Sequence, residues 1–218
     1  MSSILRERKN GRDFLLTRNL APGIRVYNED LVFRGGVEYR TWDPFRSKLA
    51  AAMLKGLPVD SIREGSRVLY LGTSTGTTSS HVSDIVGEKG LVIGVEFAPR
   101  VAREFVEKVA RQRRNVIPYV ADARDPEKYA ISQVDAVYCD IAQPDQTQIA
   151  LANCRRLLKK GGTLFLVVKA RSIDVLKEPS RVYEEERSKI EADGYRVRAV
   201  VELSPFEKDH ALIVAERP

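Results

Sequence analysis

Ionisable side chains stand directly after four successive apolar runs of this sequence. The runs end at Glu96, Asp122, Asp140 and Lys169, and each is short enough to form one buried strand. If these strands are parallel in one sheet, their carboxyl ends meet at one edge and the charged groups line one crevice. Packing alone does not explain charge at four equivalent positions. We therefore interpret this edge as the candidate site of chemistry.

Residues 67–87 (RVLYLGTSTGTTSSHVSDIVG) come first and predict a strand, a turn from Gly72 to Gly76 and a helix. Thr77 and Thr78 are the candidate caps of that helix. A strand, a glycine-containing turn and a helix in this order are typical of the first unit of a nucleotide-binding sheet. The sequence therefore predicts that the turn forms the floor of the site.

The position of Glu96 relative to this turn indicates a nucleoside ligand. Glu96 lies 20 residues beyond Gly76, the offset at which an acidic residue binds ribose hydroxyls; the alternative is an ordinary charge at a strand end. The Gly-x-x-x-Gly spacing lacks the third glycine that brings a helix close beneath a pyrophosphate. This spacing favours S-adenosylmethionine over NAD. Asp122 would then accept from the adenine amino group or, in the alternative, cap the turn that follows it.

Asp140 and Lys169 form the sharper pair, because both follow strongly apolar runs in neighbouring strands. A lysine there is desolvated unless a carboxylate holds it. The pair is therefore either a structural ion pair or part of a catalytic centre. If the last strand runs antiparallel to the others, His210 at its start lies at the same edge. The alternative is a histidine that belongs only to a turn.

The elements that position these residues alternate between strand and helix from residue 67 onward. Strands are predicted at 68–71, 91–97, 116–120, 134–141, 163–170, 195–203 and 211–215, with helices after Thr77 and at 99–113, 146–160 and 179–193. Short connections between these units imply an α/β fold with a doubly wound, seven-stranded sheet. The last two strands have no helix between them, so they should pair as a hairpin with the last strand antiparallel.

Residues 1–55 differ from the rest and predict a small β module followed by a linking helix, whereas residues 56–218 predict the larger domain. Strand-like pieces at 13–17, 24–27 and 31–33 are separated by turn residues. The linking helix is predicted to open at Asp43-Pro44. Trp42 and Phe45 are expected to anchor the core, with a role in holding a cofactor or an RNA base as the alternative, and His81 is expected to pack within its helix.

The composition indicates a globular protein with a basic surface. Of 218 residues, 43% are hydrophobic, and 36 Lys and Arg exceed 30 Asp and Glu to give a net charge of +6. This balance favours a polyanionic partner such as RNA. Cys139 and Cys154 lie in apolar patterns and are expected to be buried, reduced thiols. No run reaches transmembrane length, no Cys/His cluster suggests a metal site, and we expect a soluble cytoplasmic protein.

Several motifs together resemble fibrillarin, the 2′-O-methyltransferase family of box C/D ribonucleoproteins. They are EYRTWDPFRSKLAAA, VLYLGTSTGTTSSHVSDIVG, GVEFAPR, DAR and DIAQPDQ. The chain lacks a Gly/Arg-rich amino-terminal tail and is therefore similar to the archaeal form. It departs from the usual Gly-Ala-(Ala/Ser)-Ser-Gly turn with Gly72-Thr-Ser-Thr-Gly76, and from Trp-Asn-Pro with Trp42-Asp43-Pro44. Neither departure removes a glycine or an ionisable group of the expected site.

The resemblance implies a Rossmann-like methyltransferase domain and assigns residues to it. It implies S-adenosylmethionine contacts from Gly72, Thr77, Thr78, Glu96, Phe97, Asp122, Ala123, Asp140, Ile141, Ala142 and Gln143. It also implies a catalytic tetrad that here matches Lys48, Asp140, Lys169 and His210. The implied partners are a box C/D guide RNA and its rRNA or tRNA target, a Nop-family scaffold protein and a kink-turn-binding protein. A non-catalytic subunit of such a particle and an NAD-dependent oxidoreductase remain the alternatives.

Overall fold

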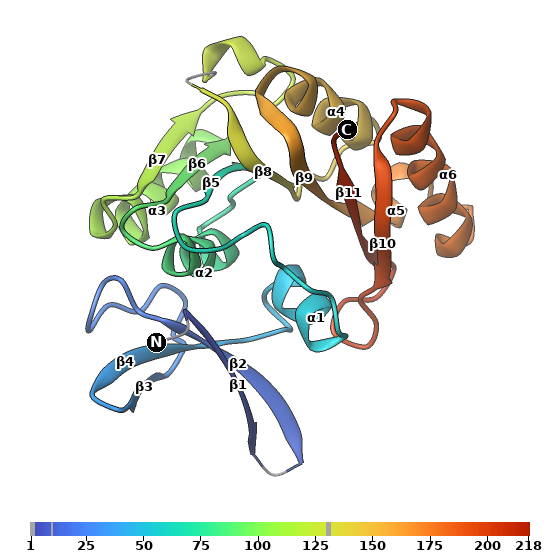
Figure 1. Ribbon diagram of the computed structural model, residues 1–218. Coiled ribbons are helices and arrows are strands. Elements are labelled where there is room, and N and C mark those ends of the chain that lie inside the picture. The colour runs from blue at the N-terminus through green and yellow to red at the C-terminus, as the bar shows by residue number, and fades with distance from the viewer. Residues whose placement is uncertain (1–2, 10, 130–131) are drawn as a thin grey trace.

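Two β-sheets organise the chain, a small one near the N-terminus and a large one with helices on both faces (Figure 1). The computed structural model describes residues 3–9, 11–129 and 132–218. None of the helices in these ranges has the length and apolar character needed to cross a bilayer. Cys139 and Cys154 are both buried and unbonded, and burial raises the pKa of the Cys139 thiol to about 12.

The N-terminal sheet contains four antiparallel strands in the order β1-β2-β4-β3. They are β1 (Ile4–Lys9), β2 (Arg12–Arg18), β3 (Leu31–Arg34) and β4 (Val37–Trp42). The predicted β module is therefore confirmed, but β1 and β4 were not anticipated and the strand predicted at 24–27 is wrong. The backbone N–H groups of Val26 and Tyr27 donate to the Glu29 carboxylate at 2.8–3.1 Å. A side chain thus takes the place of a partner strand.

The larger sheet has seven strands in the order β10-β11-β9-β8-β5-β6-β7. The bounds are β5 (Arg67–Leu71), β6 (Leu91–Glu96), β7 (Val116–Val120), β8 (Val134–Cys139), β9 (Leu158–Lys169), β10 (Arg196–Glu202) and β11 (His210–Glu216). The five strands from β7 to β9 across the sheet are mutually parallel, and β11 is antiparallel to both neighbours. The predicted fold class and terminal hairpin are confirmed. The strand order reverses between β5 and β8, where an open α/β sheet forms its ligand crevice.

Alternation along the central strands divides the core into two layers. Leu69 and Leu71 of β5 face α4 (Gln146–Leu157) and α6 (Pro179–Ala192). Val68 and Tyr70 face the opposite layer with α2 (Thr77–Val86) and α3 (Pro99–Lys108). Because successive strand residues point to opposite faces, apolar strands of this kind need helices on both sides. The doubly wound arrangement in Figure 1 meets that need.

Two helix boundaries differ from the predictions for local reasons. Helix α1 (Lys48–Leu54) begins at Lys48 rather than at Asp43-Pro44, because the Ser47 side chain caps it by accepting from the Ala50 N–H. Helix α4 ends at Leu157 rather than near Lys160, and β9 starts at once, with Leu158 paired to Val134 of β8.

Other helical segments complete the structure. Helix α3 ends at Lys108 and is followed by a 3₁₀ turn at Ala110–Gln112, whereas the prediction continued it to residue 113. A second 3₁₀ turn spans Pro126–Lys128, and α5 (Ala170–Ile173) directly follows β9.

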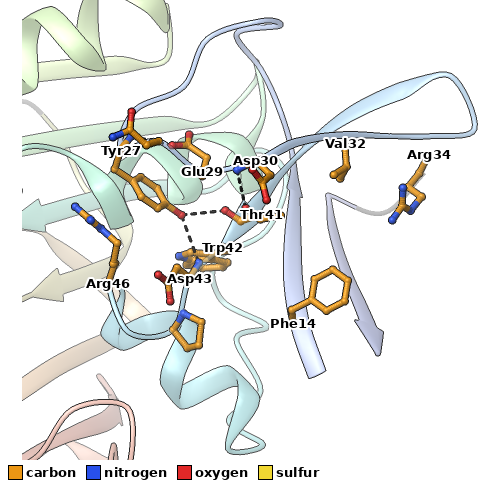
Figure 2. Close-up of a pocket in the computed structure, with 12 residues that line it drawn as sticks. Phe14, Tyr27, Glu29, Asp30, Val32, Arg34, Thr41, Trp42, Asp43 and Arg46 are labelled. Atoms are coloured by element: carbon orange, nitrogen blue, oxygen red, sulfur yellow. Dashed lines mark hydrogen bonds between the residues drawn. The ribbon is translucent and has the colours of Figure 1, made fainter. Parts of the chain in front are cut away.

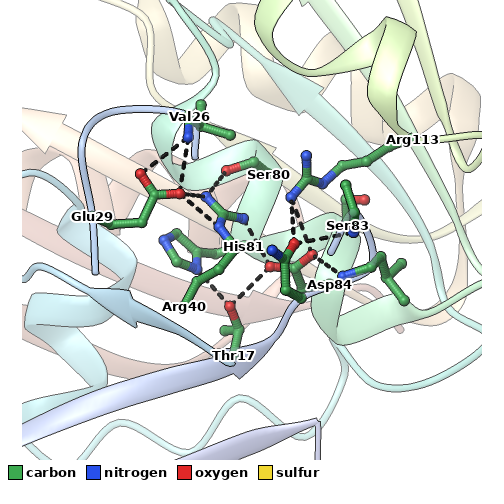
Figure 3. A network of polar contacts seen from close by, with 12 residues as sticks. Thr17, Val26, Glu29, Arg40, Ser80, His81, Ser83, Asp84 and Arg113 are labelled. Carbon is green, nitrogen blue, oxygen red and sulfur yellow. Dashed lines mark hydrogen bonds and ion pairs between the residues drawn. The ribbon is translucent and has the colours of Figure 1, made fainter. Parts of the chain in front are cut away.

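A buried polar network joins the small sheet to helix α2, which packs on the larger sheet (Figure 3). Arg40 of β4 pairs with Glu29 at 2.6 Å and with Asp84 of α2 at 2.8 Å, and all three side chains are excluded from solvent. Asp84 also accepts from the Thr17 hydroxyl at 2.9 Å. His81 lies beside this cluster, within 2.7 Å of Thr17 and stacked on Trp42, so the packing predicted for His81 and Trp42 is confirmed. The network crosses residue 55, the boundary predicted between two units.

Candidate active site

The turn after β5 is shaped by close contacts that only glycine permits. Gly72 has φ +80, and a Cβ there would lie 2.9 Å from the Asp140 carbonyl oxygen. Gly76 has φ +102, and a Cβ there would lie 2.3 Å from Val109 Cγ2 and 2.9 Å from Phe105 Cδ2. The first glycine lets the turn approach the end of β8, and the second lets α3 pack against it. The turn therefore holds the two halves of the sheet together at the reversal of strand order.

Glu96 is held at the end of β6 by backbone donors. Its Oε2 accepts from the Ser74 N–H at 2.9 Å, and its Oε1 accepts from the Ala98 N–H at 3.0 Å. Ser74, one of the two donors, adopts φ +51, an uncommon conformation for a residue other than glycine. Each Glu96 oxygen keeps a further lone pair for a ligand hydroxyl.

A pocket of about 350 Å³ opens above this turn. Nine of the sequence-predicted cofactor residues line it, namely Gly72, Glu96, Phe97, Asp122, Ala123, Asp140, Ile141, Ala142 and Gln143. Carboxylates stand at the end of β6 and just after β7, and Ile141, Ala142 and Phe97 add apolar surface to the lining. The pocket thus combines acceptors for hydroxyl and amino groups with apolar walls, as a site for a small organic ligand requires.

Thr77 and Thr78 are the two predicted cofactor residues that do not line this pocket. They are not caps either, because Gly76 occupies the N-cap position of α2 and gives no side-chain bond. The Thr78 hydroxyl instead donates to Ser47 Oγ at 2.9 Å. Its visible role is to tie α2 to the residue that caps α1.

Asp140 lies between two lysines at the edge of the pocket. Its Oδ1 is 2.7 Å from Lys169 Nζ, and its Oδ2 is 3.3 Å from Lys48 Nζ. Lys169 Nζ also donates to the Asp140 carbonyl oxygen at 3.0 Å. The three side chains are each 13–18% exposed, so they are shielded from bulk water but open to a ligand. The ion pair predicted between Asp140 and Lys169 is present, and Lys48 joins it from α1.

His210 lies at the same edge but does not enter this cluster directly. It is the ladder partner of Lys169 between β11 and β9. Its Nδ1 is 2.7 Å from the Lys208 carbonyl oxygen and 3.9 Å from Glu207 Oε2. Because a carbonyl oxygen can only accept, Nδ1 carries the proton in the hydrogen bond to Lys208. The arrangement brings three members of the predicted tetrad into contact and places the fourth one strand away.

Arg124 is a pocket residue that the prediction omitted. It lies 2.8 Å from Asp145 Oδ1, donates to Gln143 Oε1 at 3.1 Å and lies 3.7 Å from Asp122 Oδ1. Its position two residues after Asp122, in the turn that ends β7, was the available signal. The guanidinium holds the segments after β7 and β8 together along one side of the pocket.

A larger hollow of about 960 Å³ lies on the N-terminal side and is drawn in Figure 2. Tyr27, Trp42, Asp43 and Arg46 are among its lining residues, together with strand residues of the small sheet. None of the four strand-end ionisable groups lines it. The candidate site is therefore the smaller pocket at the sheet edge, where the charged groups converge.

The smaller pocket suits S-adenosylmethionine. The backbone-held Glu96 offers free lone pairs for ribose hydroxyls, and Asp122 offers a carboxylate for an amino group. The glycine at position 72 keeps the floor clear where any side chain would meet the end of β8.

The sheet order, its reversed last strand and this pocket define an S-adenosylmethionine-dependent methyltransferase fold. The chain belongs to the fibrillarin family, whose sequence model matches residues 2–218. It is 51% identical over 209 residues to a fibrillarin-like rRNA/tRNA 2′-O-methyltransferase of Sulfolobus acidocaldarius, covering 95% of this chain and 90% of the relative.

Two solved structures extend the comparison. The fold is similar to Aeropyrum pernix fibrillarin in complex with natively bound S-adenosyl-L-methionine, with a TM-score of 0.89, 48% identity and coverage of 98% and 94% of the two chains. It is also similar to fibrillarin in a fibrillarin/Nop5p complex, with a TM-score of 0.84, 39% identity and 94% coverage of each chain. The family resemblance stated from the sequence motifs is therefore confirmed.

Proposed function

We propose that this chain transfers the methyl group of S-adenosylmethionine to ribose 2′-hydroxyls of rRNA, and of tRNA, as the catalytic subunit of a guide-RNA-directed ribonucleoprotein. The observation that carries the proposal is the Asp140 carboxylate between two lysines, beside a pocket that suits the methyl donor. The names of the family relatives support the same reaction.

The cofactor is assigned to the pocket above the β5 turn. Glu96 would accept from the ribose hydroxyls, and Asp122 would accept from the adenine amino group. Phe97 and the segment from Asp140 to Gln143 would enclose the rest of the molecule. When bound, S-adenosylmethionine supplies a methyl group activated by its sulfonium charge.

The chain's own residues prepare the acceptor. A ribose hydroxyl is a weak nucleophile, so its developing negative charge needs stabilisation. The Lys169 ammonium group would face that oxygen, and Asp140 would orient the lysine through the 2.7 Å ion pair. Lys48 would hold the second Asp140 oxygen, and His210 would position the nucleotide from the neighbouring strand. Alignment of the hydroxyl with the methyl–sulfur bond would supply much of the remaining acceleration.

The sequence has no obvious motif for recognising specific RNA bases, and the proposed partners would supply that recognition. A net charge of +6 favours contacts to the phosphate backbone, which give affinity without sequence choice. We therefore assign target choice to a box C/D guide RNA, with a Nop-family scaffold and a kink-turn-binding protein completing the particle. The fibrillarin/Nop5p structure supports the scaffold. Two unbonded, buried cysteines accord with a reducing, cytoplasmic location.

Methyl transfer from labelled S-adenosylmethionine tests the proposal. The reconstituted particle should methylate the nucleotide that the guide RNA selects, and the isolated chain should show little or no transfer to naked RNA. Binding of S-adenosylmethionine without transfer by the full particle would identify a non-catalytic subunit. Titration with NAD should show no comparable binding, because the turn lacks the third glycine of a dinucleotide site.

A further inference from the structure

Phe45 is the exposed aromatic residue nearest in sequence to the lysine–aspartate cluster, and its position contradicts the prediction that it anchors the core. It is 63% exposed. Two other phenylalanines of the described chain are similarly exposed, Phe33 at 65% and Phe97 at 69%. Phe97 lines the cofactor pocket, and Phe33 lies on β3 of the small sheet. Phe45 therefore has no core or cofactor role that would explain an exposed ring.

The backbone around Phe45 is firmly held. The Asp43 carboxylate accepts from the Phe45 N–H at 2.8 Å and fixes the turn before α1. The Arg46 guanidinium lies over the Tyr27 ring, 5.3 Å from its centroid, on the side of the hollow in Figure 2. The residues on both sides of Phe45 are therefore held by contacts, and the exposed ring stands on the turn between them.

Phe206 supports the ring from the other side. The two ring centroids are 5.2 Å apart with an interplanar angle of 70°, an edge-to-face contact. Phe206 is partly buried against the core and lies in the loop between β10 and β11. Lys55, at the end of α1, donates to the Ser204 carbonyl oxygen in that loop at 2.6 Å. Phe45 and Phe206 thus form an aromatic shelf, with Phe45 as its exposed surface.

The shelf adjoins the proposed active site through both of its segments. Phe45 precedes Lys48 by three residues, and Phe206 precedes His210 by four. Three extended residues span at most about 11 Å, so the Phe45 backbone lies within that distance of the Lys48 backbone. Lys48 in turn lies 3.3 Å from Asp140, so the shelf is connected to the lysine–aspartate cluster through a short stretch of chain.

The charges around the shelf favour RNA over another protein. Basic side chains in its two segments and at the end of α1 are Arg46, Lys48, Lys55 and Lys208. Of the nearby acids, Asp43 accepts from the Phe45 N–H and Asp209 pairs with Arg171 at 3.2 Å. Glu207 is the remaining carboxylate within the two segments, and it lies 3.9 Å from His210 Nδ1. Outside them, Glu178 and Glu202 line a hollow beside the Phe206 loop, which Arg171 also lines.

We propose that the Phe45 ring, supported by Phe206, stacks on a base of the target strand at or beside the modified nucleotide. Stacking on an aromatic ring suits any base, because every base has a π face. A guide-directed enzyme needs that tolerance, since the guide rather than the protein selects the sequence. The inference rests on the proposed function and adds a positioning contact to it. It also separates roles, since Phe45 meets the RNA whereas Phe206 orients Phe45.

Single-turnover methylation by the reconstituted particle is the first test. Guide pairing supplies most of the affinity, so loss of stacking lowers the fraction of targets docked in the site and slows the reaction. Phe45→Leu should slow transfer by roughly 5- to 150-fold, the range expected for one stacked base. Phe45→Tyr should restore most of the rate, and Phe206→Leu should give a smaller loss. Phe33→Leu, at an equally exposed ring on the small sheet, is the matched control.

Abasic ribonucleotides test the same contact from the RNA side. A target that lacks the base at the modified position or at one neighbour should be slow with the wild type. The same target should show little further loss with Phe45→Leu, because the contact is already absent. Equal abasic losses in both proteins at every position would overturn the proposal.

A fluorescence measurement keeps the inference separate from the proposed function. 2-Aminopurine at the position found by the abasic scan should change its emission on binding to wild-type particle, with or without methyl transfer, and not with Phe45→Leu. A particle that never methylates but gives this signal would refute the function and retain the contact. If Phe45→Leu instead loses the Nop-family scaffold in co-elution while the emission change persists, the shelf is a protein interface and the proposal fails.

Discussion

The two oxygens of Asp140 serve different lysines, and this division explains how one carboxylate can organise the site. Lys169 Nζ is 2.7 Å from Oδ1, and Lys48 Nζ is 3.3 Å from Oδ2. The cluster carries one more positive than negative charge, so it is suited to a developing anion at the acceptor oxygen. The tighter pair fixes Lys169, which also donates to the Asp140 carbonyl oxygen.

Removal of the Lys169 ammonium group should therefore affect chemistry more than cofactor binding. We expect Lys169→Ala to lower the single-turnover rate of the particle by about 10²–10³-fold, as for loss of one electrostatic stabiliser. The dissociation constant for S-adenosylmethionine, measured by calorimetry, should change by less than about threefold. Lys160→Ala, at an exposed lysine near the other end of β9, should leave both quantities unchanged. Turnover of the Lys169→Ala protein at the wild-type rate would exclude the role.

Residue types alone revealed only part of this constellation. Asp140 and Lys169 were recognisable because an ionisable group after an apolar run has no packing explanation. Lys48 gave no such signal, since a solvated lysine on the surface of a helix is ordinary, and only the family motif identified it. Phe45 was misassigned for the opposite reason, because an aromatic side chain is usually buried and the sequence does not show that its turn points outward.

At the scale of the elements, the β5 turn depends on two separate properties of glycine. Gly76 has a positive φ, and Val109 and Phe105 also pack so closely against it that they leave no room for a Cβ. Gly161 has a positive φ of 71° but nothing within 4 Å of an added Cβ, so it isolates the backbone effect.

The comparison of these two glycines yields a stability prediction. Gly161→Ala should lower the free energy of unfolding by about 1–2 kcal/mol, the cost of a left-handed residue. Gly76→Ala should lower it by about 2–5 kcal/mol, because overpacking against α3 adds to that cost. Urea unfolding followed by circular dichroism measures both values. Equal losses in the two variants would show that α3 moves away without cost.

The elements themselves were predictable where burial dominates. The central strands β5, β6 and β8 read as continuous apolar runs, so they were found with nearly correct bounds. The sequence did not indicate that Glu29 would replace a partner strand at Val26 and Tyr27, or that β9 would begin directly after α4. These outcomes depend on contacts between distant segments, which local patterns do not contain.

At the scale of the whole molecule, the buried network makes the small sheet and the methyltransferase sheet depend on each other. Asp84 of α2 pairs with Arg40 and accepts hydrogen bonds from the Thr17 hydroxyl and the Leu20 N–H. All three partners belong to the N-terminal part of the chain. Loss of Arg40 would leave the buried Glu29 carboxylate without its cationic partner, which costs about 3–5 kcal/mol, whereas Asp84 would keep Arg113. The sequence pattern changes near residue 55, but the network spans that position. A domain boundary there stays a prediction.

His81 within this interface should make the protein acid-labile. Burial, reinforced by Arg40 and Arg113, holds the pKa of His81 well below its usual range, whereas the unfolded chain takes up a proton near pH 6.5. The unfolded state then binds more protons, so stability falls as the pH drops below 6.5, by up to about 1.4 kcal/mol per pH unit. Urea midpoints between pH 7.5 and 4.5 should show this slope.

Glu29, a second buried group, causes a further loss of stability at lower pH. Burial alone would raise the pKa of Glu29, but Arg40 and the backbone donors lower it overall. Its stabilising contribution is present above the unfolded value of about 4.3 and is lost as the pH falls further. His81→Asn should therefore flatten the slope above pH 4.5 and leave the decline below it. An unchanged slope in His81→Asn would assign the acid lability to other groups.

The place of β11 has a consequence for biosynthesis. It lies between β9 and β10, yet both neighbours leave the ribosome before it does. Until residues 210–216 emerge, β9 presents an open, apolar edge to other nascent chains, and unpaired edges of this kind promote aggregation. The seven-stranded sheet therefore cannot close before residues 210–216 have been translated. Ribosome stalling upstream of codon 210 should yield insoluble, inactive fragments, and chaperone demand should peak during that interval.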